Sequence, residues 1–321
     1  MTDYLYLRLP NWVGDACMCL PAIKRLQAAG LPLVLCGQPW AEDLFAGLAP
    51  AGYVPVGKGW RADRAAIRSR YPAGRGARGV VFTNSLSSAA ALRLAGIRTA
   101  GYRGDGRSLL LTWPFNKREG RHEVEIFHDL ARLALWRWNV AGSVPEEPDA
   151  TLGLPLTEGH GAAADAALAA AGISGPFVLL SPTATGLHHG KAKAWPEFAA
   201  LAASLQREGW TCVTCPPAHE VEQARAAVPT ATILPSLPLG AFASLTAKAA
   251  LVVCNDSGTS HVAAAAGARQ ITLFGVTRRE RTGPWSKKAV CLGSDTAWPT
   301  LDEVERSARF ALVGSSIAAL P

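Results

Sequence analysis

Two patterns of apolar positions alternate along the first hundred residues. Short runs of Val, Leu and Ile predict buried strands, and Ala- and Leu-rich stretches with apolar positions three and four residues apart predict helices. Strands are expected at 4–9, 33–36 and 79–83, and helices at 16–28 and 40–48. This alternation is typical of a parallel sheet covered by helices.

The same alternation returns after a segment at 139–155 that contains Pro and Gly and is typical of an exposed linker. Strands are expected at 177–181, 211–215, 251–254 and 270–274, and helices at 162–171, 196–208, 221–227, 239–247 and 260–266. We therefore predict two doubly wound α/β domains, 1–150 and 151–321. We expect a last helix, 301–312, to pack back on the first domain.

Composition limits the compartment and the redox chemistry. Hydrophobic residues make up 49% of the chain, yet no run reaches the roughly 18 apolar residues of a membrane-spanning helix. The amino terminus lacks the basic segment of a secretory signal, and the seven cysteines are odd in number. We expect a cytoplasmic protein with reduced thiols. Cys212 and Cys215 supply only two zinc ligands and should face opposite sides of a strand, so we expect no metal site.

The net charge of +7 is concentrated in the first domain. Residues 1–150 hold 19 Lys and Arg against 13 Asp and Glu, whereas residues 151–321 hold 13 against 12. The excess is densest in a Gly-rich stretch formed by Lys58, Arg61, Arg64, Arg68, Arg70, Arg75 and Arg78. Such a stretch is compatible with nucleic acid, an anionic membrane or an anionic substrate as partner, and equally with an ordinary solvated surface.

The loop after the first expected strand carries a candidate catalytic carboxylate. Ligands of parallel α/β sheets bind at the carboxyl ends of the strands, and Asp15 follows Gly14 at the entrance of a helix there. From the local sequence alone, an ordinary helix N-cap is the simpler interpretation of Asp15. We expect burial around Trp12, which would keep the carboxylate basic enough to accept a proton from a hydroxyl.

The loop after the first strand of the second domain is rich in hydroxyls, glycines and lysines. It runs from Ser181 to Pro196 and includes Thr183, Thr185 and Lys193, so it is a candidate pyrophosphate cradle. A polar surface loop is the alternative. The loop lacks the spacing of a P-loop, which argues against ATP hydrolysis. It also holds adjacent histidines at 188 and 189, but adjacent side chains diverge, so they do not indicate a metal.

The third polar loop follows the strand at 251–254 and has the sequence Asn255-Asp256-Ser257-Gly258-Thr259-Ser260. A small-residue helix follows, with His261 in its first turn. Free backbone N–H groups at a helix start, with hydroxyls beside them, bind anions without a metal. A helix cap explains Asp256 alone but not the whole polar cluster, so we interpret this turn as a binding site.

Several separated blocks resemble one family. They are Arg8 to Asp15 followed by Pro21-Ala22-Ile23, the segments 84–89, 95–97 and 101–107, His122 to Glu125, Lys193-Ala194-Trp195-Pro196, and Asn255 to His261. In this order they resemble the bacterial lipopolysaccharide heptosyltransferases that use ADP-heptose, and segments 84–107 are similar to heptosyltransferase II in particular. The resemblance covers most of the chain.

The resemblance implies a GT-B fold, in which two doubly wound Rossmann-like domains face a central cleft. It implies an inverting, metal-independent transfer of heptose from ADP-heptose, without another cofactor, to a phosphorylated Kdo–lipid A acceptor at the cytoplasmic face of the inner membrane, and no nucleic acid partner. Asp15 would be the general base. The acceptor site on the first domain would include Asn11, Ser85, Ser87, Arg103 and Arg107. The donor site on the second would include Thr183, Thr185, Lys193, Glu220, Glu222, Asp256, Ser257, Gly258, Thr259 and His261.

Departures from the family pattern surround the expected donor contacts. Ser181-Pro182-Thr183 stands where the family usually has Pro-Gly-Ala, Ala194 replaces an arginine, and Thr259-Ser260 replaces Leu-Met. Another nucleotide-sugar, another acceptor such as a protein, or a nucleotide-binding protein without catalysis are therefore alternatives. A NAD-dependent enzyme is disfavoured because neither domain begins with a G-x-G-x-x-G turn.

Overall fold

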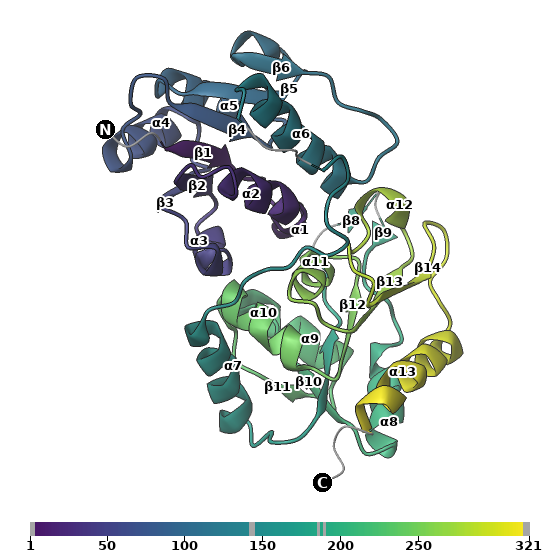
Figure 1. Ribbon diagram of the computed structural model, residues 1–321. Coiled ribbons are helices and arrows are strands. Elements are labelled where there is room, and N and C mark those ends of the chain that lie inside the picture. The colour runs from purple at the N-terminus through teal and green to yellow at the C-terminus, as the bar shows by residue number, and fades with distance from the viewer. Residues whose placement is uncertain (1–3, 141–144, 185–186, 189–190, 317–321) are drawn as a thin grey trace. The chain divides into compact units, whose positions relative to one another are not determined.

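The computed structural model describes residues 4–140, 145–184, 187–188 and 191–316. The chain divides into two compact units, residues 1–150 and 151–321. Each unit contains one six-stranded sheet whose paired strands are all parallel (Figure 1). Among the described residues, no helix is long and apolar enough to cross a membrane.

The first unit alternates strands and helices along most of its length. Its strands are β1 Leu5–Arg8, β2 Leu33–Gly37, β3 Gly52–Pro55, β4 Arg78–Val81, β5 Arg98–Tyr102 and β6 Trp113–Phe115. Its helices are α1 Val13–Met18, α2 Leu20–Gln27, α3 Trp40–Leu44, α4 Trp60–Arg70, α5 Leu86–Leu94 and α6 Glu123–Arg137, with short 3-10 turns η1 Ala46–Leu48 and η2 Arg107–Leu109. The predicted helix at 16–28 is two helices, because Pro21 lies in the first turn of α2, where a missing N–H is tolerated.

Helices cover both faces of the first sheet. On one face, Tyr6, Val34 and Val54 pack with Ile67 of α4 and Leu92 of α5. On the other face α2 packs against α6. These side chains are almost fully buried, so truncation of one of them to Ala would cost about 2–5 kcal/mol of unfolding free energy.

The second unit repeats the plan and adds a small hairpin. Its strands are β7 Phe177–Ser181, β10 Thr211–Thr214, β11 Thr232–Ile233, β12 Leu251–Asn255, β13 Gln270–Phe274 and β14 Ala289–Gly293, and β8 Leu187–His188 pairs antiparallel with β9 Lys191–Ala192. Its helices are α7 Glu158–Ala170, α8 Phe198–Arg207, α9 Val221–Ala227, α10 Leu239–Lys248, α11 Gly258–Ala265, α12 Arg279–Thr282 and α13 Leu301–Ser316, with the 3-10 turn η3 Ala218–Glu220.

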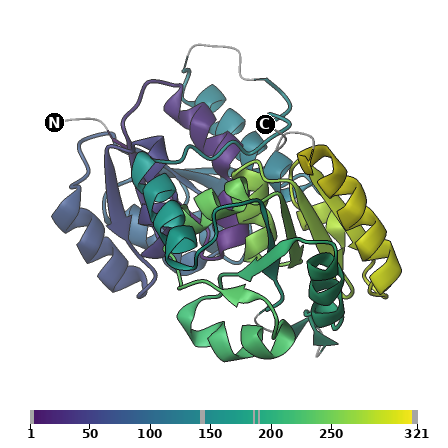
Figure 2. The ribbon, with the colours of Figure 1, turned by 90° about the horizontal axis from the view of Figure 1, so that it is seen from below.

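The two faces of the second sheet have separate cores. Helices α8 and α13 cover one face, where Val253 packs with Phe198 and Val304, and α13 lies beside α8 in both views (Figures 1 and 2). Leu179 and Val252 belong to the core of the opposite face, which contacts α7, α10 and α11. The face of α13 that carries Val304, Ala308 and Leu312 thus packs within the second unit, and the expected contact of this helix with the first domain stays a prediction.

Both sheets have the strand order 3-2-1-4-5-6 when each unit is counted from its own first strand. The first sheet runs β3-β2-β1-β4-β5-β6 and the second β11-β10-β7-β12-β13-β14. In such a sheet the order reverses between the first and fourth strands, and the loops after these two strands form the crevice in which ligands bind. The relevant pairs are β1 with β4 and β7 with β12.

Candidate functional site

The turn after β12 lies at the reversal point of the second sheet. Helix α11 begins at Gly258, and Ser257 is its N-cap in an extended conformation, but the Ser257 side chain makes no capping hydrogen bond. Within the described ranges, the buried Ser257 Oγ has no hydrogen-bond partner. Asp256, for which a helix cap was the alternative interpretation, therefore lies one residue before the N-cap. A helix start that no side chain caps leaves its N–H donors and a hydroxyl for an anion.

The carboxylate of Asp256 is held by a neighbouring loop. Thr277 Oγ1, in the loop after β13, donates a hydrogen bond of 2.6 Å to Asp256 Oδ2. Because β13 is the strand next to β12, Thr277 reaches the same edge of the sheet. The second carboxylate oxygen can still accept hydrogen bonds from a hydroxyl-rich ligand.

The loop after β7 meets this turn at both of its ends. Ser181 and Thr259 share a hydrogen bond of 3.2 Å between their hydroxyls. Thr183 is buried, with 7% of its surface exposed, and Lys193 is half-buried. The structure thus brings Thr183 and Lys193 into the loop beside the Asp256 turn. Thr185 and the second of the two adjacent histidines lie outside the described residues.

Asn255 does not face a ligand, although the polar turn begins with it. Its side chain is completely buried. Its Oδ1 accepts a hydrogen bond of 2.9 Å from the backbone N–H of Trp195, and its Nδ2 donates one of 2.8 Å to the carbonyl of Pro182. The amide therefore joins the two ends of the loop after β7.

The other predicted donor contacts lie at different depths. His261 is buried in α11, with 6% of its surface exposed. Glu220 ends η3 and is almost buried, whereas the side chain of Glu222 is 86% exposed and pairs with Arg225 at 3.7 Å. Both glutamates follow β10, the strand beside β7, so they lie toward the carboxyl edge. Of the two glutamates, the nearly buried Glu220 is the better candidate to accept a hydrogen bond from a ribose hydroxyl.

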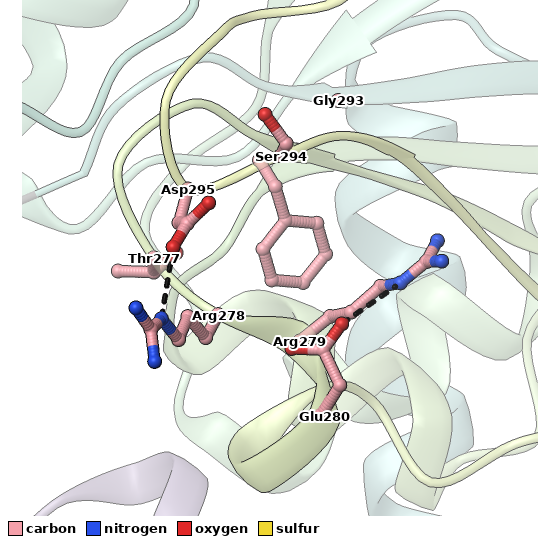
Figure 3. A pocket seen from close by; sticks show the side chains of 8 residues that line it. Thr277, Arg278, Arg279, Glu280, Gly293, Ser294 and Asp295 are labelled. Atoms are coloured by element: carbon pink, nitrogen blue, oxygen red, sulfur yellow. Dashed lines mark hydrogen bonds and ion pairs between the residues drawn. The ribbon is translucent and has the colours of Figure 1, made fainter.

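A polar pocket of about 340 Å³ lies at the carboxyl ends of β13 and β14 (Figure 3). Its walls include Thr277 and Phe274, so the pocket adjoins the Asp256 turn through the Thr277 hydrogen bond. Arg278 pairs with Asp295 at 2.8 Å, and Arg279 pairs with Glu280 at 3.6 Å. Each arginine in the walls therefore has a carboxylate partner, which favours an uncharged ligand with many hydroxyls over a second anion.

The first unit carries Asp15 at the reversal point of its own sheet. Asp15 is half-buried in the first turn of α1, and the N-cap of this helix is Trp12. The N-cap interpretation of Asp15 is therefore wrong. Our expectation of burial around Trp12 is also wrong, because Trp12 is 77% exposed.

Asn11 belongs to a polar cluster that the sequence did not predict. Arg8 is 2% exposed at the end of β1, and its guanidinium donates to Asn11 Oδ1 at 2.8 Å and to the carbonyl of Leu9. Gln38, which follows β2, donates to the same Asn11 oxygen at 3.4 Å. Burial lowers the pKa of the Arg8 guanidinium. Arg8 therefore supports the loop that leads to Asp15.

Two of the predicted acceptor residues have structural roles. Ser85 is the N-cap of α5 and accepts a hydrogen bond of 3.3 Å from the Ser88 N–H. Arg107 is 4% exposed, and its guanidinium donates to the carbonyls of Tyr102, Asn84 and Arg103 and to the Asn84 side chain. We therefore assign Arg107 to the connection between the loops after β4 and β5, in place of the predicted acceptor contact. Ser87 is half-buried and Arg103 is exposed.

The basic stretch does not form one patch at this edge. Arg61, Arg68 and Arg70 are exposed along α4, and Arg64 donates to the Leu94 carbonyl at 2.9 Å. Arg78 begins β4 and lies over the Trp138 ring, at the amino end of the sheet. Arg75 precedes it, so this end of the stretch lies away from the carboxyl edge. Only Lys58 and the start of α4 remain near that edge.

The cysteines are packing residues. Cys212 and Cys215 lie in the cores of opposite faces of the second sheet, as strand alternation predicts. Burial raises the pKa of the Cys212 thiol to about 12 and that of Cys215 to about 11. Neither is a thiolate near neutral pH. In the part of the chain that the structure describes, no cluster of three His, Cys, Asp or Glu side chains is arranged to hold a metal ion.

The block from His122 to Glu125 has a local structural explanation. His122 is the N-cap of α6 and its Nδ1 accepts from the Val124 N–H at 3.2 Å, while Glu125 accepts from the His122 N–H at 2.8 Å. This reciprocal capping box starts a long helix. Sequence reasoning missed Gln38 and Thr277, and it named Arg8 in the resemblance without giving it a role. Their common signal is a polar side chain at or just after the end of an apolar strand.

Comparison with known proteins connects these features to one family. The sequence model of glycosyltransferase family 9 (heptosyltransferase) matches residues 75–310. A lipopolysaccharide heptosyltransferase 1 of Pseudomonas aeruginosa is 36% identical over 110 residues, which are 32% of this chain and 31% of the relative. This match thus spans less than a third of the curated relative's length.

Solved structures share the fold over nearly the whole chain. An E. coli ADP-heptose lipopolysaccharide heptosyltransferase II has a TM-score of 0.78 at 24% identity, covering 98% of this chain and 100% of that chain. An E. coli heptosyltransferase solved with ADP has a TM-score of 0.76 at 21% identity, covering 96% and 99%. A family 9 glycosyl transferase of Veillonella parvula has a TM-score of 0.76 at 16% identity, covering 96% and 89%. The predicted GT-B class with two Rossmann-like domains is confirmed.

Proposed function

Because the chain belongs to glycosyltransferase family 9 (heptosyltransferase), we propose that it transfers heptose from ADP-heptose to an inner-core lipopolysaccharide acceptor of the Kdo–lipid A type. The observation that carries the proposal is the uncapped start of α11 at the reversal point of the second sheet. An anionic diphosphate is the ligand class that such a helix start binds.

The second unit would hold the donor. Diphosphate oxygens accept hydrogen bonds from the Gly258 and Thr259 N–H groups and the Ser257 hydroxyl, and Lys193 and Thr183 approach from the other loop. Asp256, whose carboxylate is held by Thr277, accepts hydrogen bonds from hydroxyl groups of the sugar. The sugar extends toward the pocket of Figure 3. Its size and its paired charges suit a neutral sugar. Glu220 accepts a ribose hydroxyl, and His261 supports the helix start.

The first unit would hold the acceptor and the base. Asp15 removes the proton of the acceptor hydroxyl as that oxygen forms a bond to the anomeric carbon. The bond from this carbon to the diphosphate breaks at the same time, ADP leaves with the electron pair, and the anomeric centre is inverted. Lys193 and the α11 amides stabilise the departing charge, which needs neither a metal nor another cofactor. Asn11, Ser87 and Arg103 would contact the acceptor, and this is supported by the fact that none of the three is buried.

Acceptor chemistry would bring the first unit to the cytoplasmic face of the inner membrane as a peripheral protein. Trp12 and Leu109 follow β1 and β5 and are 77% and 91% exposed, in a unit with excess positive charge. Exposed apolar side chains on a unit with net positive charge favour an anionic interface. We expect co-sedimentation with phosphatidylglycerol vesicles to exceed that with phosphatidylcholine vesicles and to fall for Trp12→Ser. Equal sedimentation with both would contradict this placement.

A donor screen tests the proposed function. Thermal unfolding is followed with ADP-heptose, ADP, and UDP- and GDP-sugars at equal concentration, and ADP-heptose should raise the midpoint most, because a ligand that binds only the folded state stabilises it. Transfer to a Kdo–lipid A acceptor is then measured with the same donor. A larger shift with a UDP-sugar would rule out the heptose donor. A shift with ADP-heptose but no transfer to any acceptor would support a binding protein without catalysis.

A further inference from the structure

The buried amide of Asn255 connects two backbone segments that belong to the ends of one loop. Strand β12 pairs with β7 so that Cys254 lies opposite Ser181. The next residues are Asn255, which ends β12, and Pro182, which directly follows β7. The amide uses both of its functions there: Nδ2 donates to the Pro182 carbonyl at 2.8 Å and Oδ1 accepts from the Trp195 N–H at 2.9 Å. Residues 182 and 195 are thereby held to the same side chain.

Both ends of the loop have further anchors. Trp195 is 3% exposed, its Nε1–H donates to the Pro299 carbonyl at 2.9 Å, and its ring packs edge-on against Phe198 at 5.3 Å. At the entry end, the Ser181 hydroxyl meets that of Thr259 at 3.2 Å. The Asn255 amide joins the exit end to the entry end.

We propose that Asn255 is a positioning residue that holds Thr183 and Lys193 in register with the start of α11. Thr183 follows Pro182 directly, and Lys193 is two residues before Trp195, so both candidate donor contacts lie next to the atoms that Asn255 holds. The inference rests on the proposed donor site. Asn255 itself does not touch the donor, because its side chain is completely buried and both of its polar atoms are occupied.

The chemistry of the two contacts requires an amide of this length. The partner at Pro182 is an acceptor and the partner at Trp195 is a donor, so the bridging group must donate on one side and accept on the other. An ionised aspartate has the same shape but places an anionic oxygen against the Pro182 carbonyl. An aspartic acid in its neutral form restores the pattern, because its O–H donates to Pro182 and its carbonyl accepts from Trp195.

The test measures ADP binding by calorimetry for Asn255→Asp and Asn255→Ala, with Val253→Ala as the matched control. Val253 lies two residues earlier on the same face of β12 and is equally buried, but it makes none of these hydrogen bonds. We expect both Asn255 variants to weaken ADP binding at pH 8 by roughly a hundredfold, because small misplacements of binding groups have effects of this order. Val253→Ala should bind ADP as the wild type does.

The pH dependence distinguishes positioning from general loss of stability. Burial raises the pKa of a carboxyl group, so the introduced aspartate becomes neutral as the pH falls. The ratio of ADP dissociation constants, Asn255→Asp over wild type, should therefore fall between pH 8 and pH 5.5, while the ratio for Asn255→Ala stays constant. If Asn255→Ala does not fold, ADP binding by Asn255→Asp at pH 8 and at pH 5.5 still tests the proposal.

Three outcomes overturn the proposal. The first is wild-type ADP affinity in Asn255→Asp at pH 8, and the second is a loss of ADP affinity in Val253→Ala equal to that in the Asn255 variants. The third is a ratio of ADP dissociation constants, Asn255→Asp over wild type, that does not change with pH. These failures differ from failure of the proposed function, which would appear as no ADP binding by the wild type. Normal wild-type binding with unaffected variants would refute the role of Asn255 alone.

Discussion

In both units a helix follows the fourth strand of the 3-2-1-4-5-6 order, and in both the residue at its N-cap is serine. Ser85 of the first unit caps α5 through its side chain. Ser257 of the second unit makes no such hydrogen bond, and its buried hydroxyl has no partner within the described ranges. The same residue at the same topological position thus completes one helix and leaves the other ready for a ligand.

The loops beside these two helices also differ in what their buried polar side chains connect. In the first unit the buried Arg107 ties the loop after β4 to the loop after β5. In the second unit Asn255 ties together the ends of the loop after β7 and leaves α11 uncapped. A shared topology therefore supports two different tasks, which we propose are acceptor activation on Asp15 and donor binding at α11.

The largest expected effect belongs to the chemistry of the first unit. Asp15→Asn should lower kcat by roughly 10²–10⁴-fold, because the amide cannot accept the proton, while the ADP-heptose dissociation constant stays near that of the wild type. Steady-state turnover and calorimetry measure the two quantities. Asp43→Asn is the matched control, since Asp43 is also half-buried in the first turn of a helix. Unchanged turnover in Asp15→Asn would show that Asp15 is not the general base.

The next effect belongs to donor binding in the second unit. Lys193→Gln should weaken ADP binding by roughly ten- to hundredfold, because a hydrogen bond to a charged group contributes about 1.5–3 kcal/mol. The loss should shrink in high salt. Lys287→Gln removes an exposed cation from the same unit and should leave the affinity unchanged. Equal effects of the two substitutions would mean that only the net charge matters.

A pair of serine substitutions tests the comparison directly. Ser85→Ala should lower the free energy of unfolding by about 1 kcal/mol, the usual value of an N-cap, and leave ADP affinity unchanged. Ser257→Ala should leave stability nearly unchanged, because no capping bond is lost, and weaken ADP binding. Urea unfolding and calorimetry on both variants give the four values. Equal losses of stability and equal losses of ADP affinity in the two variants would show that the helix starts do not differ in function.

The smallest effect is a pH dependence of stability in the first unit. His128 is 1% exposed on α6, and burial, followed by Arg25 and Arg132, lowers its pKa, while Asp149 and Asp129 oppose this shift. The unfolded chain then binds the proton more readily, so stability should fall as the pH drops below about 6.5. In His128→Leu, the midpoint of urea unfolding should change less between pH 8 and pH 5 than it does in the wild type. His219→Leu, at an exposed site, should match the wild type.

Sequence periodicity was sufficient for the fold class and for the location of the three polar loops, although strands β3, β5, β6, β11 and β14 were not among those predicted. The alternation of apolar runs predicted two doubly wound sheets, and the rule for carboxyl edges led to Asp15, Lys193 and Asp256. It did not distinguish the tasks of Ser85 and Ser257, because both precede helices and only the local backbone decides where the hydroxyl lies. It also missed the exposure of Trp12 and the burial of Arg107, which depend on how neighbouring loops pack.

Contacts between distant segments were out of reach for the same reason. Thr277 meets Asp256 only because β13 is the neighbour of β12. The sequence places Asn255 in a binding turn because it precedes Asp256, and nothing in its own neighbourhood indicates partners at Pro182 and Trp195. Side chains that point away from their own segment are visible only once the strand order is known.

The amide bridge of Asn255 also has a consequence for the order of folding. Its partner Pro182 is 73 positions away in the chain, so the bridge can form only after β12 has joined β7. Contacts between segments so far apart in the chain form late, because closing the intervening loop costs conformational entropy before the contact contributes any stability. The donor site would therefore be absent from every partly folded form of the second unit, and donor binding would report its complete assembly.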